Sequence, residues 1–113
     1  MKRYSLAVDL KDDPALVADY ERLHSPSQIW PEITASIRDA GILDMQIYRT
    51  GNRLFMIMET SDDFSFEHKA AMDRDNAAVQ RWETLMWDYQ QALPWAAPGE
   101  KWVLMEPIFA LSK

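Results

Sequence analysis

The order in which two hydrophobic periodicities follow one another constrains the fold of this chain more than any other feature. Apolar and polar residues alternate with period two, as in a strand with one buried face, in residues 4–10 and again in residues 103–111. Residues 43–60 alternate on either side of Thr50–Gly51–Asn52 and predict a hairpin. The sequence therefore predicts four strands, with Pro107 favouring an edge position or a bulge in the last one.

Apolar residues spaced by three and four positions predict helices between these strands. The first helix follows Asp13–Pro14, a capping acid before a proline suited to the first helical turn. Residues 25–28 break it, and helical spacing resumes over residues 30–41. The longest apolar stripe runs over residues 75–93 and predicts the last helix.

The predicted order is strand, broken helix, strand, strand, helix and strand. This is the order of a ferredoxin-like βαββαβ domain, an α+β fold with an antiparallel sheet and helices on one face. A length of 113 residues suits a single domain over residues 1–113. Because a lone sheet would expose its second face as an apolar patch, we expect two copies to pair sheet to sheet as a homodimer.

Charge and composition exclude several classes of function. Eighteen acidic and 12 basic residues give a net charge of −6, the wrong sign for binding nucleic acid or an anionic membrane. No apolar run approaches the roughly 20 residues of a membrane helix. The absence of cysteine excludes disulfides and thiolate metal sites and is typical of a cytoplasmic protein. Motifs of nucleotide-binding loops and zinc proteases are also absent.

The sequence contains two side chains that titrate near neutral pH without perturbation, His24 and His68. His68 lies in a charged stretch and is expected to be solvated. His24 follows Tyr20 by four residues, so both rings project from one helical face. A histidine at a helix end more often serves as a cap, but here the helix break brings Trp30 and Glu32 back near it. An imidazole beside a phenol and an indole can bind a polyol and transfer a proton.

One set of residues is shared with a known family: Tyr20–Glu21–Arg22–Leu23–His24, Ile29–Trp30–Pro31–Glu32–Ile33, Gly41, Ile47–Tyr48, Leu54–Phe55, Glu59, Gln80–Arg81–Trp82 and Met86. On these residues the chain resembles the L-rhamnose mutarotase family over essentially its entire length. The resemblance implies a dimeric α/β barrel that interconverts the α and β anomers of a 6-deoxyhexose without metal or cofactor. It also implies that His24 is the proton donor and that Tyr20 and Trp82 hold the sugar.

The sequence departs from the family pattern at three places. Two extra residues lie between His24 and Ile29, which alters the presentation of Trp30. Met45 stands where the rhamnose enzymes have a sugar-contacting tyrosine, and Glu83 stands where they have a second tryptophan. Because both changes alter hydrogen-bond partners in the implied sugar site, we expect the preferred sugar to be L-fucose.

Other functions stay open on sequence grounds. L-rhamnose mutarotation is the alternative within the family. A cofactor-free oxygenase of the dimeric α/β-barrel type would share the topology and a pocket histidine. A sugar-sensing module would bind the same ligand without accelerating anomer exchange. Judged by helical period alone, Trp82 favours core packing over ligand contact.

Overall fold

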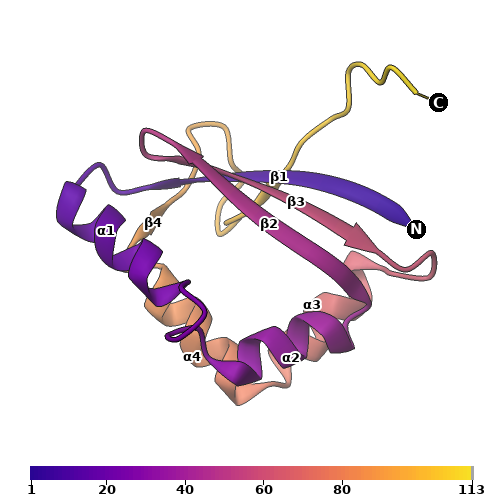
Figure 1. The fold of residues 1–113 in the computed structure, drawn as a ribbon, viewed down its shortest axis with the longest axis horizontal. Coiled ribbons are helices and arrows are strands. Elements are labelled where there is room, and N and C mark those ends of the chain that lie inside the picture. Colours follow the sequence, from indigo (N-terminus) through magenta and orange to yellow (C-terminus); the bar gives the residue numbers. More distant parts are fainter. Residues whose placement is uncertain (113) are drawn as a thin grey trace.

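One antiparallel sheet, covered on one face by helices, forms the protein in a computed structural model that describes residues 1–112 (Figure 1). The strands are β1 (Lys2–Leu10), β2 (Ile42–Thr50), β3 (Arg53–Thr60), β4 (Gln90–Gln91) and β5 (Val103–Leu104). Their order is β2-β3-β1-β4, with β5 also paired to β1. This is the ferredoxin-like order, so the predicted α+β class and topology are confirmed.

Alternation along the strands directs every second side chain toward the helices. In β3, buried and half-buried residues alternate over the whole strand, and Leu54, Met56 and Met58 take buried positions. Val8 of β1 is completely buried. The opposite face of the sheet carries half-buried residues such as Ile57. The core therefore lies between the sheet and the helices.

Three helices begin where a side chain can cap them. In α1 (Pro14–Leu23), the Asp13 carboxylate accepts hydrogen bonds from the amides of Ala15 and Leu16, as the sequence predicts. Asn76 caps α4 (Ala77–Met86) in the same way.

The predicted break separates α1 from α2 (Pro31–Asp39), whose first turn contains Glu32 and whose N-cap is Trp30. The chain leaves α2 through Gly41, whose φ of 94° few other residues adopt. Among residues 1–112, no helix is long and apolar enough to cross a membrane.

The region between residues 61 and 93 differs from its prediction. The sequence pattern missed one helix, α3 (Phe66–Arg74), which is capped by Ser65, whose hydroxyl accepts a hydrogen bond from the amide of His68. It buries no residue completely, so it has no strong apolar stripe to detect. The helix predicted over residues 75–93 ends at Met86, because the chain turns there and pairs with β1 through β4.

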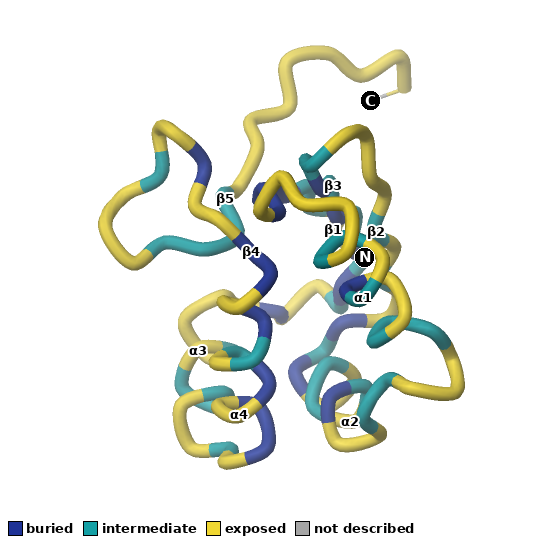
Figure 2. Tube along the Cα trace, turned by 90° about the vertical axis from the view of Figure 1, so that its left-hand side faces the viewer, coloured by how far each residue is buried: buried dark blue, intermediate teal, exposed yellow. Residues whose placement is uncertain are grey.

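The prediction of a strand over residues 103–111 is correct only at its start. Val103 and Leu104 pair with β1, and the last hydrogen bond joins the amide of Met105 to the carbonyl of Ser5. Pro107 has no amide proton, so the ladder cannot continue through it. Beyond it the chain leaves the sheet (Figures 1 and 2), and Ile108 is 95% exposed.

Candidate active site

Helix α1 brings Tyr20 and His24 together one turn apart, as the sequence predicts. Their ring centroids lie 4.2 Å apart. The Nδ1 atom of His24 lies 2.8 Å from the backbone carbonyl oxygen of Tyr20. Because a carbonyl only accepts hydrogen bonds, Nδ1 must carry the proton in this contact. The other ring nitrogen, Nε2, is then a free acceptor in the neutral imidazole.

Burial keeps both rings uncharged at neutral pH. It lowers the pKa of His24 below its usual 6.5, while the hydrogen bond to the Tyr20 carbonyl acts in the opposite direction. Burial also raises the pKa of Tyr20 to about 12. The two side chains thus place a proton acceptor and a proton donor side by side, because each ring keeps its neutral form.

Two tryptophans extend this aromatic group. The ring centroid of Trp82, on α4, lies 5.3 Å from that of His24, and the ring centroid of Trp30 lies 5.0 Å from that of Trp82. Trp82 is only 6% exposed and belongs to the main core cluster. It therefore serves the core and borders the site at the same time, so the two interpretations of its position are compatible.

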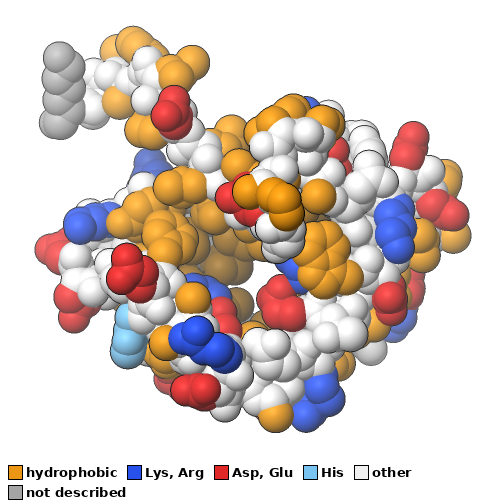
Figure 3. Space-filling view, turned by 180° about the vertical axis from the view of Figure 1, so that it is seen from behind, with side chains coloured by type: hydrophobic (Ala, Val, Ile, Leu, Met, Phe, Trp, Pro, Cys, Tyr) orange, Lys and Arg blue, Asp and Glu red, His pale blue; other side chains and the backbone are white. Residues whose placement is uncertain are grey.

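A cavity of about 340 Å³ opens beside these rings. The volume falls at the lower end of the roughly 300–1,000 Å³ typical of small-molecule sites. Five of the six predicted site residues line it: Tyr20, His24, Met45, Trp82 and Glu83. The sixth, Trp30, packs against Trp82 and does not line the cavity. Figure 3 shows the surface hollowed near the centre of the molecule, with apolar, acidic and basic side chains around the hollow.

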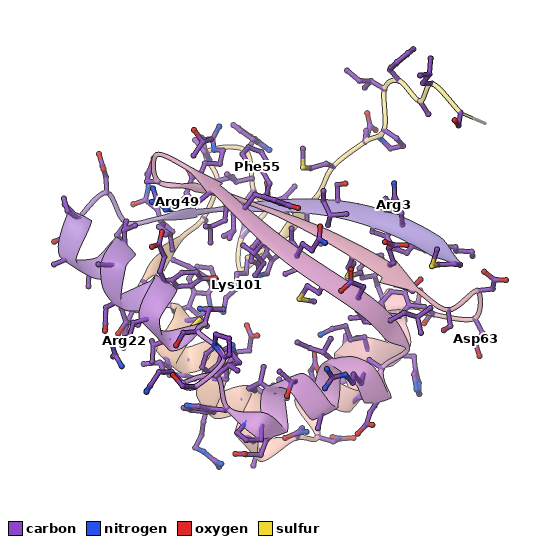
Figure 4. The ribbon with its side chains drawn as sticks, viewed as in Figure 1. Arg3, Arg22, Arg49, Phe55, Asp63 and Lys101 are labelled. Atoms are coloured by element: carbon purple, nitrogen blue, oxygen red, sulfur yellow. The ribbon has the colours of Figure 1, made fainter. Side chains whose placement is uncertain are left out.

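Lys101 is a polar group of the cavity that sequence reasoning missed. Its Nζ lies 2.5 Å from the Glu83 carboxylate and 3.1 Å from the Glu83 carbonyl, and it sits 4.7 Å from the centroid of the Trp87 ring. Its side chain is 10% exposed and lies between the sheet and the helices (Figure 4). Lys101 precedes β5 in a loop, where no periodicity indicates which way a side chain points.

A second ion pair and a buried amide also line the cavity. Lys69 and Asp73 pair one turn apart on α3. Gln90 is buried on β4 and donates a hydrogen bond to the hydroxyl of Tyr20. These residues were missed because the sequence pattern predicted neither α3 nor β4. His68 is exposed, as expected. Within residues 1–112, no group of three or more potential metal-ligating side chains is present.

Comparison with known proteins gives consistent results. The family model of L-rhamnose mutarotase matches residues 3–111. An L-fucose mutarotase of Xanthomonas campestris is 50% identical, over 100% of this chain and 90% of the relative. An L-rhamnose mutarotase of Acidiphilium cryptum is 34% identical, over 82% of this chain and 86% of the relative.

Two solved structures share the fold. The L-rhamnose mutarotase of Formosa agariphila superposes with a TM-score of 0.71 at 22% identity, covering 98% of this chain and 99% of its own. The tetracenomycin F2 cyclase of Streptomyces glaucescens superposes with a TM-score of 0.62 at 15% identity, covering 100% of this chain and 99% of its own. At these identities the similarity concerns the fold alone.

Proposed function

The chain belongs to the L-rhamnose mutarotase family, and we propose that it interconverts the α and β anomers of a 6-deoxyhexose, with L-fucose preferred over L-rhamnose. The observation that supports this most directly is the pairing of Tyr20 and His24 at the wall of a cavity of sugar size. Both are neutral at neutral pH, and one offers a proton while the other accepts one. Mutarotation needs these two abilities next to each other.

His24 is the proposed proton-transfer residue. Its free Nε2 accepts the proton of the anomeric hydroxyl as the pyranose ring opens, and returns a proton to that oxygen as the ring recloses on either face of the carbonyl. His24 thus acts as base and then as acid within one cycle. The family resemblance implies a donor role, and the donor role corresponds to the second half of this cycle.

The preference for L-fucose rests on two observations. The relative that is 50% identical is an L-fucose mutarotase. In addition, Met45 and Glu83 both line the cavity, where one offers a thioether and the other a carboxylate held by Lys101. A carboxylate only accepts hydrogen bonds, so it favours a sugar that presents a hydroxyl toward it.

We also propose that the protein is a cytoplasmic homodimer. The sheet face away from the helices carries half-buried apolar residues, among them Phe55 and Ile57. The segment after β5 exposes 80% of Phe109 and 90% of Leu111. Together these surfaces form an apolar area of the kind that a second copy covers. The cytoplasmic location rests on the cysteine-free composition.

Exchange NMR of the anomeric protons tests the function directly. The protein should accelerate exchange of L-fucose more than that of L-rhamnose. His24→Ala should lower the rate by a factor of about 10²–10⁴ while the protein stays folded, and His68→Ala, the control, should leave it unchanged. A protein that binds these sugars without accelerating exchange would be a sensing module instead.

A separate experiment tests the proposed sugar preference. It replaces Met45 and Glu83, the two residues that differ from the family pattern, by the residues of the rhamnose enzymes. Met45→Tyr combined with Glu83→Trp should shift the ratio of kcat/KM values toward L-rhamnose. Polar groups left without partners discriminate by about 1–3 kcal/mol each, so the shift should be at least tenfold. A wild-type protein that already prefers L-rhamnose would show that these two residues do not set the preference.

A further inference from the structure

Gln90 is a polar residue whose side chain is buried, and such burial is energetically unfavourable. Its backbone pairs with Leu10 of β1, its side chain lines the cavity beside Tyr20, and the residue is 3% exposed. Its Oε1 is buried without a hydrogen-bond partner among residues 1–112. An unpaired buried acceptor lowers the free energy of unfolding. Groups that lower stability in this way are expected at functional sites, where another benefit maintains them.

Among residues 1–112, the side chain of Gln90 makes one hydrogen bond, and this bond determines where the hydroxyl proton of Tyr20 can point. Its Nε2 lies 3.3 Å from the hydroxyl oxygen of Tyr20. An amide nitrogen only donates, so the phenol oxygen is the acceptor and its own proton must point elsewhere. Within the described residues 1–112, the structure shows no acceptor for that proton. Tyr20 therefore has a proton available for a molecule bound in the cavity.

Tyr20 and His24 then present opposite polarities to a ligand. The phenol proton is free to be donated, and the Nε2 atom of His24 is free to accept. A pyranose presents the matching pair at its anomeric carbon. The anomeric hydroxyl has a proton to give, while the ring oxygen carries no proton and can only accept one.

We propose that Gln90 is a positioning residue that holds Tyr20 as the general acid of ring opening, directed at the ring oxygen of the sugar. This inference rests on the proposed mutarotase function and adds the acid that works with His24. Gln90 acts through Tyr20 and need not touch the reacting atoms.

His24 Nε2 takes the proton of the anomeric hydroxyl, and the electron pair of that O–H bond forms the carbonyl. The bond between the anomeric carbon and the ring oxygen breaks, and its electron pair goes to the ring oxygen, which takes the proton of Tyr20. Rotation about the adjacent carbon–carbon bond and reversal of these steps restore both side chains and give the other anomer.

A comparison of two adjacent glutamines tests the inference. Gln90→Met keeps the length of the side chain but removes the amide, and should lower kcat by about tenfold with little change in KM, because Tyr20 stays in place without a fixed direction. Gln91→Met is the matched control, since Gln91 is exposed on the same strand and should not affect the rate. If Gln90→Met fails to fold, Gln90→Leu replaces it.

A double-variant experiment asks whether Gln90 works through Tyr20. Tyr20→Phe should lower kcat by a factor of about 10² or more, and adding Gln90→Met should cause no further loss, because the group that Gln90 directs is gone. If the two losses simply multiply, or if Gln90→Met alone has the rate of the wild type, the inference is wrong.

The identity of the leaving atom gives an independent readout. In 5-thio-L-fucose the ring atom is sulfur, and a thiol has a pKa of about 8.5, so its thiolate leaves without help from an acid. Gln90→Met should therefore slow the interconversion of the L-fucose anomers but not that of the 5-thio-L-fucose anomers. Equal slowing of both sugars would contradict the acid role. Failure of the wild type to accelerate any 6-deoxyhexose would instead contradict the proposed function itself.

Discussion

At the scale of single residues, the environment of His24 determines how the activity should depend on pH. Burial lowers its pKa below 6.5, and the proposed reaction starts from the base form of His24. As pH rises, kcat/KM should therefore increase through a pKa below 6.5. It should then stay level past pH 10, because burial raises the pKa of Tyr20 to about 12. A pH–rate profile whose rising limb lies clearly above pH 6.5 would contradict this assignment.

The same residue links the stability of the protein to pH. His24 binds its proton less readily in the folded protein than in the unfolded chain, because burial lowers its pKa. Its contribution to stability is therefore complete above about pH 6.5 and is lost as the pH falls through the lower folded pKa. Urea unfolding at pH 7.5 and 5 should show a smaller loss of stability for His24→Phe than for the wild type.

Trp82 should show two effects when it is replaced, because it belongs to both the core and the cavity wall. Trp82→Phe keeps an aromatic ring of smaller volume. We expect the free energy of unfolding to drop modestly, by about 1–2 kcal/mol, and sugar affinity to fall more, by about tenfold or above. Thermal unfolding and sugar titration measure the two effects. Unchanged affinity with a large loss of stability would assign Trp82 to the core alone.

The sequence alone predicts that two residues lie close together when both belong to one helix. Tyr20 and His24 are four positions apart, and any helix over that segment brings them to one face. Lys101 and Gln90 reach the cavity only through the path of the chain after Met86. That path depends on a two-residue strand and a loop, which leave no periodic signal.

At the scale of secondary structure, α1 carries both residues of the proposed proton transfer, so its ends should matter for activity. Asp13 caps its first turn through two backbone amides. Asp13→Ala should reduce the free energy of unfolding by about 1 kcal/mol, as the loss of an N-cap usually does. At temperatures well below unfolding the rate should be nearly unchanged, because the pair sits at the opposite end of the helix. A loss of activity without a loss of stability would contradict this interpretation.

Hydrophobic periodicity predicted some of the helices and strands correctly and failed for others. The hairpin of β2 and β3 and helices α1 and α2 follow strong patterns and were predicted within a few residues. Helix α3 was missed because all of its residues are exposed or half-buried, so it has no apolar stripe. Residues 105–111 alternate like a strand, but the ladder stops at Met105 and so the pattern has no partner. An alternating pattern does not by itself predict a strand where a proline such as Pro107 interrupts the hydrogen-bond ladder.

At the scale of the whole molecule, the exposed apolar surfaces predict association. Sedimentation at micromolar concentration should give twice the mass of the 13.2 kDa chain. The double substitution Ile108→Ser and Phe109→Ser removes apolar groups that are 95% and 80% exposed in a single copy. It should therefore increase the proportion of monomer. A wild-type protein that sediments as a monomer would contradict the proposed dimer.

The common origin of Tyr20 and His24 on one helical turn has a consequence for how such proteins can diversify. Their relative position is set by the backbone of α1, whereas Met45, Glu83 and Lys101 reach the cavity from other parts of the chain. Substitutions at these outer positions can accumulate without disturbing the pair. Under the proposed assignment, reaction and substrate preference lie on separate segments, so natural selection can exchange one sugar for another while inheriting the chemistry intact.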